Sequence, residues 1–344
     1  MLTPLESHLA WHHDDVKDPE SWTYHLLAQD LVELDDALAH AKSISSDLLD
    51  LEQVDFPLPT LAHRLTAIER ELIDGRGFVR IRGLPVERYS DDDLTLLYWG
   101  IGLHLGEPWP QNKHGHLMGD VTDQGKALSD PTFRGNELGQ VALDYHTDGA
   151  DLIGLMCLRA ARAGGLSLVA NAVAIHNDLL ATRPDLVAAL YEALPYDFRG
   201  EQPEGSKPFY SFPVFTAFAG RLFVRFIPHY IRASQRHAEA PRLSPETLEA
   251  LEVVSAMARR QEYNVYMDLA PGDMQFINNY HVLHGRTAYR DDAASGHKRH
   301  LKRLWLAAHH LTQRPPHFRR QGRDHWGRQR TASHIPAVAR GTAH

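Results

Sequence analysis

Residues 140–158, QVALDYHTDGADLIGLMCL, contain the two runs that decide the fold. Polar and apolar side chains alternate over residues 140–146, as they do in a half-buried β-strand. Residues 152–158 form a continuous apolar run, which is typical of a strand buried on both faces. Gly149 lies between the runs and allows the backbone to turn sharply. We therefore predict two short strands separated by a turn.

The rest of the chain alternates between helical and extended patterns. Apolar residues at helical spacing, or helix-start signals, predict helices within residues 24–51, 61–73, 91–105, 173–194 and 244–263. Alternating or apolar runs predict further strands within residues 78–82, 212–226, 274–278 and 299–308, the second of them a hairpin turning at Ala219-Gly220. Strands that are distant in sequence, with helices placed before and between them, favour an α+β fold built around an antiparallel barrel or jelly roll.

Neither an internal repeat nor a low-complexity linker divides the chain, so we expect a single domain over residues 1–312. Its helical N-terminal part would cover residues 20–75, and its core, at about 76–310, would carry the helical inserts 173–194 and 244–263. Residues 313–344 hold seven arginines and one acidic residue, Asp324, and form a basic C-terminal extension.

Composition excludes several classes of protein. The 344 residues are 43% hydrophobic and 23% charged, which excludes intrinsic disorder over the whole chain. The net charge of −8 argues against a nucleic-acid partner. A single cysteine, Cys157, excludes an internal disulfide or a thiolate-bound metal cluster. No run approaches the roughly eighteen apolar residues of a membrane span, and residues 1–15 do not resemble a secretory signal, so we expect a cytoplasmic protein.

The tripeptide His146-Thr147-Asp148 is the strongest candidate for chemistry. The pattern His-x-Asp occurs four times in the chain, which makes it weak by itself. Two copies overlap in residues 12–15, a polar segment, and a third, at residues 176–178, falls in an expected helix, where side chains two positions apart diverge. His146 instead ends an expected strand, so that its side chain and that of Asp148 project from the same face. These two residues can therefore bind one ion.

A facial triad of two histidines and one carboxylate leaves three positions open on Fe(II), and it requires a second histidine. Residues 272–286, GDMQFINNYHVLHGR, supply two candidates, His281 and His284. The residues by themselves leave that choice open.

A segment rich in arginine follows, residues 298–306, KRHLKRLWL. With a period of two, Arg299, Leu301, Arg303 and Trp305 share one face of a strand. If this face lines the barrel, two guanidinium groups are buried, and buried arginines require an anionic partner such as a carboxylate. An Fe(II) oxygenase that uses 2-oxoglutarate requires this combination, because one end of the keto acid chelates iron and the other needs a fixed cation.

Together these motifs resemble the taurine dioxygenase/clavaminate synthase-like (TauD/TfdA-type) group of Fe(II)/2-oxoglutarate oxygenases. The matching pieces, which span about half the chain, are His146-Thr147-Asp148, Gly164-Gly165-Leu166-Ser167, Pro271-Gly272-Asp273, Asn278-Asn279 through His284-Gly285-Arg286, and Arg299 through Arg303. The resemblance implies a distorted double-stranded β-helix (jelly roll) with helical inserts.

The resemblance also implies roles for individual residues. It makes His146, Asp148 and His284 the iron ligands, and Arg299 the principal arginine for the 2-oxoglutarate carboxylate. Ser167 matches a position whose hydroxyl assists that carboxylate, although Gly-Gly-Leu-Ser departs from the commoner Gly-Gly-Asp-Thr. Arg303 matches a residue that contacts either the cosubstrate or an anionic substrate.

The expected function is therefore oxidation of a C–H bond in a small anionic or zwitterionic substrate, such as an amino acid or another carboxylate. Fe(II), 2-oxoglutarate and O2 would be required, with release of succinate and CO2. Hydroxylation, desaturation and cyclisation all fit, and the sequence is compatible with a homo-oligomer. Two alternatives are a zinc or manganese cupin-like hydrolase or isomerase, and a catalytically silent jelly-roll binding protein.

Overall fold

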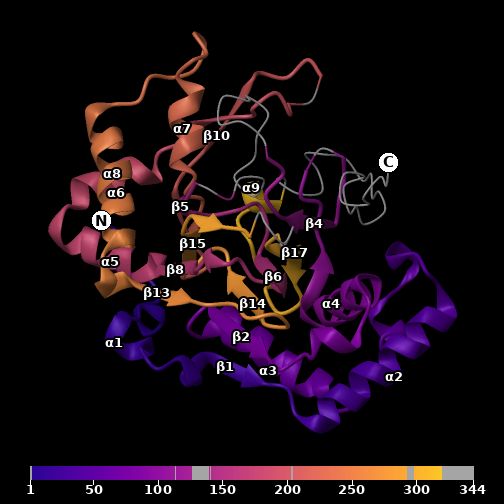
Figure 1. Ribbon diagram of the computed structural model, residues 1–344. Helices are drawn as coiled ribbons and strands as arrows, with labels where there is room; N and C mark the ends of the chain where they lie inside the picture. Colours follow the sequence, from indigo (N-terminus) through magenta and orange to yellow (C-terminus); the bar gives the residue numbers. More distant parts are fainter. Residues whose placement is uncertain are drawn as a thin grey trace.

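The computed structural model describes residues 2–112, 114–125, 139, 141–202, 204–292 and 298–319. Two β-sheets form its centre, and helices cover them on the outside. Figure 1 shows α5, α6 and α8 gathered at one side of the sheets, while α2, α3 and α4 lie at another. This arrangement confirms the expected α+β class, and the described strands form separate sheets and not a closed barrel.

The larger sheet has seven strands in the order β1, β2, β14, β6, β17 and β3, with β4 also paired to β17. All of its pairings are antiparallel except that of β1 with β2. The strands are β1 (Thr23–His25), β2 (Phe78–Arg82), β3 (Gly106–Pro108), β4 (Met118–Val121), β6 (Leu152–Arg159), β14 (Met274–Asn278) and β17 (His300–Ala308).

The smaller sheet is antiparallel and has the order β13, β8, β15, β5. Its strands are β5 (Leu143–His146), β8 (Ser167–Asn171), β13 (Asn264–Met267) and β15 (Val282–Arg286). Three two-stranded pairs complete the β-structure: β7 (Ala163–Gly164) with β16 (Tyr289–Arg290), β9 (Leu194–Asp197) with β10 (Phe209–Phe212), and β11 (Phe215–Phe218) with β12 (Arg221–Val224).

The helices lie before or between the strands in sequence, except α9, which follows the last strand. They are α1 (His13–Val16), α2 (Ala28–Ile44), α3 (Leu61–Asp74), α4 (Asp91–Leu105), α5 (Ala172–Thr182), α6 (Pro184–Tyr191), α7 (Pro228–Ser234), α8 (Pro245–Arg259) and α9 (Pro316–Arg319). Ser90 caps α4 and Ser244 caps α8, because each hydroxyl accepts a backbone N–H of the first turn. Among the described residues, no helix combines the length and hydropathy that a membrane span requires.

The core has two parts because each strand of the sheets presents alternate residues to opposite sides. Ile153, Cys157, Leu301 and Trp305 belong to a buried cluster between the two sheets. Their neighbours on the same strands pack into the larger cluster under the helices, as Leu304 and Leu306 do. The predicted face of residues 299–305 therefore does face the space between the sheets, where the candidate site lies.

The structure corrects one expected helix boundary and confirms one expected turn. The helix predicted within residues 24–51 begins only at Ala28, because Thr23–His25 pairs with β2 and extends the sheet. The hairpin turn at Ala219-Gly220 is confirmed, and both residues adopt the positive φ angles of a tight β-turn. The basic C-terminal extension lies almost wholly outside the described residues, which end at residue 319.

Candidate active site

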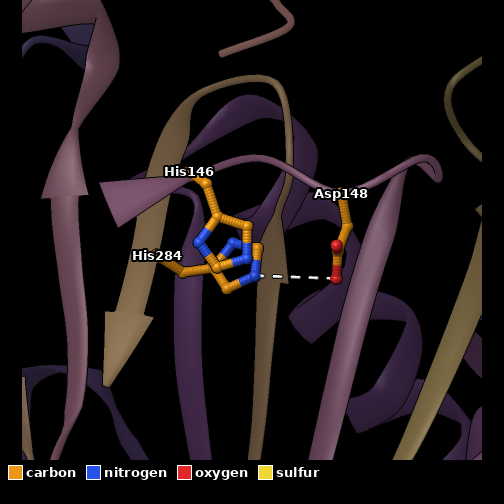
Figure 2. A group of neighbouring side chains, drawn as sticks. All are labelled: His146, Asp148 and His284. Atoms are coloured by element: carbon orange, nitrogen blue, oxygen red, sulfur yellow. Dashed lines mark ion pairs between the residues drawn. The ribbon is translucent and has the colours of Figure 1, made fainter. Parts of the chain in front are cut away.

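Two strands of the smaller sheet and the turn after β5 bring together two histidines and one aspartate. His146 ends β5 and is the direct cross-strand partner of His284 on β15, so their ring centroids lie 4.4 Å apart. Asp148 follows β5, and its Oδ2 lies 3.6 Å from Nε2 of His284 (Figure 2). One ligand atom from each of the three residues lies within 4.8 Å of the others. The three side chains thus form a compact group that could hold a metal ion.

Hydrogen bonds to the backbone hold the turn that carries Asp148. The side chain of Asn279, which is fully buried, accepts the N–H of Asp148 at 2.7 Å and donates to the carbonyls of Asp148 and Ala150, both at 2.8 Å. Thr147 exchanges hydrogen bonds with the backbone of Phe226, donating its N–H at 2.8 Å and accepting at Oγ1 at 2.9 Å. The carboxylate of Asp148 therefore stands on a backbone that is fixed from two sides.

The protonation states of the group suit a divalent cation. Nδ1 of His146 lies 2.8 Å from the carbonyl of Asp144, which can only accept, so in the neutral ring Nε2 keeps its lone pair. Burial and the adjacent His284 lower the pKa of His146 to about 4. Burial opposes ionisation of Asp148, but its hydrogen bond with His284 and the charge of Arg303 outweigh that effect and hold its pKa well below the ordinary range. A neutral His146 and an ionised carboxylate fit the Fe(II) donor set.

The structure separates the two histidines between which the sequence left a choice. His281 is buried away from the triad, with its Nε2 3.1 Å from Oε2 of Glu6 and its Nδ1 3.1 Å from Nδ2 of Asn278. The carboxylate of Glu6 also accepts from Arg221 and from the backbone of Leu222. His281 therefore ties the N-terminal segment to the core, and His284 lies with His146 and Asp148.

Arg299 is a buried cation that has no anionic partner for its guanidinium among the residues that the structure describes. Its side chain donates from Nη2 to the carbonyl of Gly165 at 3.2 Å, and its guanidinium lies 4.9 Å from the ring centre of Tyr289. Nη1 is buried without a hydrogen-bond partner among the described residues, and burial lowers the pKa of the group. An unpaired buried guanidinium is costly, which makes this position suited to a ligand carboxylate.

Glycine at position 165 makes room for Arg299. Its φ is +78°, and an added Cβ would lie only 2.8 Å from Nε of Arg299. Ser167 begins β8 two residues later, is buried, and pairs with Arg286 in the strand register. The Gly164-Gly165-Leu166-Ser167 motif and Arg299 are therefore adjacent, as the sequence resemblance implies.

Arg303 lies on the aspartate side of the group. Its Nη1 is 3.9 Å from Oδ2 of Asp148, and its guanidinium lies 5.3 Å from the ring centre of Trp305. Nε donates at 2.8 Å to Oε1 of Gln111, whose amide nitrogen donates in turn to the carbonyls of Leu117 and Arg303. Gln111 thus fixes the orientation of Arg303.

Sequence reasoning missed the roles of some neighbours. Asp120 on β4 is buried against Lys302 and His300 and supports the sheet beside the site. Arg225 donates to the main-chain carbonyl of Asp148, yet no motif singled it out. The sequence motif included Asn279 without giving it a role. The signal that could have found this role is the polar pair Asn278-Asn279, which follows an apolar run.

Comparisons with known proteins identify the family of the chain. The profile of the Taurine catabolism dioxygenase TauD, TfdA family matches residues 41–305. The chain belongs to this family. FR-33289 synthase from Streptomyces rubellomurinus is 32% identical over 316 residues, which cover 91% of this chain and 93% of that relative. Enduracididine beta-hydroxylase from Streptomyces hygroscopicus is 28% identical over 281 residues, covering 67% of this chain and 76% of that relative.

Solved structures share the fold of this TauD/TfdA-family chain. Asparagine oxygenase in complex with Fe(II), (2S,3S)-3-hydroxyasparagine and succinate has a TM-score of 0.62 at 18% identity, over 83% of this chain and 93% of that one. The non-heme iron oxygenase OrfP in complex with Fe and α-ketoglutaric acid has a TM-score of 0.60 at 18% identity, again over 83% and 93%. These likenesses confirm the expected double-stranded β-helix architecture.

Family membership decides the reaction class. The chain is an oxidoreductase of the dioxygenase type, which uses Fe(II), 2-oxoglutarate and O2. The expected family and cofactors are thereby confirmed, and the hydrolase, isomerase and silent-binder alternatives are set aside.

Proposed function

We propose that His146, Asp148 and His284 hold Fe(II), and that Arg299 holds the distal carboxylate of 2-oxoglutarate with the assistance of Ser167. The observation that carries this proposal is the pairing of two features: a two-histidine, one-carboxylate group within 4.8 Å, and a buried guanidinium that lacks an anionic partner among the described residues. When bound, Fe(II) and 2-oxoglutarate supply the oxidising chemistry with O2, and succinate and CO2 are released.

The side chains of this protein bind and orient the iron and the cosubstrate. His146 and His284 offer imidazole nitrogens from paired strands, and Asp148 offers one carboxylate from a turn that Asn279 clamps. Arg299 fixes the cosubstrate through a charge-assisted contact in a place from which water is largely excluded. This arrangement leaves the side of the triad next to Arg303 and Trp305 for the substrate.

We propose that the substrate is a small anionic or zwitterionic molecule of the amino-acid type, and that it is hydroxylated. Enduracididine beta-hydroxylase is named for an amino-acid hydroxylation, and the solved relatives include complexes with hydroxyasparagine and (3S)-hydroxy-L-Arg. The position of Arg303 at the triad supports an acidic group on the substrate, because a guanidinium beside the reaction site would pair with it.

The test measures iron binding and succinate release by the purified protein with Fe(II), ascorbate and 2-oxoglutarate, over a panel of amino acids and small acids. We expect about one Fe(II) per chain and succinate formation that a true substrate stimulates. His284→Ala should lose both iron and succinate formation, whereas the matched variant His281→Ala should keep iron and measurable turnover. If His281→Ala loses iron and His284→Ala retains it, the proposed ligand set is wrong.

A further inference from the structure

The turn after β5 brings a second arginine to the triad. Arg225 follows β12, and its Nη1 donates to the main-chain carbonyl of Asp148. Nη2 donates at 3.3 Å to the hydroxyl of Tyr210 on β10. Thr147 holds the segment in place, because it pairs with the backbone of Phe226 on the other side of Arg225. These contacts set the guanidinium of Arg225 against the backbone of Asp148.

Gly149 lies between Arg225 and Trp305. A Cβ there would lie 3.2 Å from Cζ3 of Trp305, which is tighter than ordinary van der Waals contact, and 3.4 Å from Nη1 of Arg225, at the lower limit of ordinary contact. Trp305 carries the guanidinium of Arg303 over its ring. Arg225 and Arg303 are therefore both next to Asp148, and both lie near the indole of Trp305.

This corner of the site has more positive charge than its carboxylates balance. In the described part of the chain, Arg303 has one ion pair, its 3.9 Å contact with Asp148, and Arg225 has none. In the proposed complex, Fe(II) and Asp148 leave one positive charge, and 2-oxoglutarate with Arg299 leaves one negative charge. Arg225 and Arg303 then contribute two positive charges, and no further carboxylate pairs with either of them in the described part of the chain.

Two N–H donors in the same corner also lack acceptors. Nε of Arg225 and Nε1 of Trp305 are both buried, and neither has a hydrogen-bond partner among the described residues. Buried donors are satisfied in the great majority of cases, and a water molecule, an ion or a ligand can complete an exception. The excess charge and the unused donors therefore indicate the same kind of ligand, an anion.

We propose that Arg225 is a substrate-recognition residue, and that together with Arg303 it selects a substrate whose acidic end carries two negative charges. A phosphonate, a phosphate ester or a pair of adjacent carboxylates has this chemistry, and a single carboxylate or sulfonate matches only one of the two cations. Tyr210 is a positioning residue, because its hydroxyl holds Nη2 of Arg225. This inference rests on the proposed function, in which the substrate lies on the side of the triad next to Arg303 and Trp305.

The test compares acids of nearly equal shape and different charge. Calorimetry under anaerobic conditions measures the binding of 2-aminoethylphosphonate and of taurine to the complex of the protein with Fe(II) and 2-oxoglutarate at pH 8. L-Aspartate and L-asparagine form a second pair, which tests for two carboxylates, and inorganic phosphate is the minimal probe. We expect the doubly charged member of at least one pair to bind about tenfold more tightly or better.

Arg225→Gln should remove this preference, weakening the doubly charged probe about tenfold to a hundredfold and changing the singly charged one little. The affinities for Fe(II) and 2-oxoglutarate should stay within about twofold of the native values. Arg232→Gln is the matched control, since Arg232 lies on α7, pairs with Glu252 and has no hydrogen bond or ion pair with the triad residues in this structure, so the variant removes the same charge from another place. This control should keep the native preference.

Several results would overturn the inference. Native protein that binds none of the probes, or that binds both members of each pair equally, has no subsite for two charges. A preference that survives in Arg225→Gln assigns recognition elsewhere, and a selective loss of 2-oxoglutarate affinity makes Arg225 a cosubstrate residue. A purely structural role would lower iron affinity and leave the charge preference intact. Succinate release without added substrate tests the proposed function separately, so the two failures can be told apart.

Discussion

Replacing Arg299 tests the cosubstrate site most directly. The side chain is 4% exposed, it donates one hydrogen bond to the carbonyl of Gly165, and it has no ion pair within the described residues. A 2-oxoglutarate carboxylate would be its only anionic partner. Breaking a buried, charge-assisted pair of this kind costs about 3 kcal/mol. At about 1.4 kcal/mol per tenfold change, Arg299→Ala should weaken 2-oxoglutarate binding by roughly two orders of magnitude.

The assay is a titration of the Fe(II) protein with 2-oxoglutarate under anaerobic conditions, followed by the 2-oxoglutarate dependence of succinate release. Iron content should stay native, because Arg299 does not contact the triad in this structure. Arg299→Lys should restore only part of the affinity, since an ammonium group cannot reproduce the fork of a guanidinium. Arg290→Ala is the control, because Arg290 is an exposed arginine nearby on β16.

An unchanged 2-oxoglutarate affinity in Arg299→Ala would refute this reasoning. If Arg303→Ala showed the loss instead, the carboxylate would bind on the aspartate side of the triad. The proposed substrate side would then need to be reassigned as well.

Three further predictions follow from individual contacts. Asn279→Ala should destabilise the protein by about 2–4 kcal/mol and weaken Fe(II) binding, because it leaves the N–H of Asp148 and the carbonyls of Asp148 and Ala150 without their buried partner. Thermal unfolding and iron titration measure the two effects, and a native iron affinity would show that Asn279 does not fix the position of Asp148. Cys157 should resist a thiol-reactive reagent at pH 8 until the protein unfolds, since burial raises the pKa of its thiol from 9.0 to about 12, and rapid labelling of the native protein would argue against this. Because the thiol ionises more readily in the unfolded chain, its contribution to the free energy of unfolding should fall between pH 9 and 12 by about 1.4 kcal/mol per pH unit. Asp148 supplies a carboxylate to the triad, so we expect oxygenated products and no chlorination even in high chloride. Mass spectrometry of the products checks this, and a chlorinated product would mean that Asp148 does not bind the metal.

Local patterns in the sequence determine much of the fold and of the candidate site. The period of two in residues 299–305 predicts that Leu301, Arg303 and Trp305 share a face, and the strand places this face between the sheets. The same period sets His146 and Asp148 on one side of the chain. Helix starts such as Ser90 and Ser244 are also readable, because capping depends on residues only three positions apart.

Contacts between distant segments decided the rest. The residues by themselves leave His281 and His284 as two candidates, and the family resemblance selects His284. The pairing of β15 with β5 sets His284 opposite His146, while Glu6 pairs with His281. Residues 23–25 have the pattern of a helix start and become a strand because β2 offers its edge to them. Asn279 and Arg225 reach Asp148 across 131 and 77 positions of sequence. Periodicity carries no information about such contacts, because it reports which face a residue occupies and not which segment packs against that face.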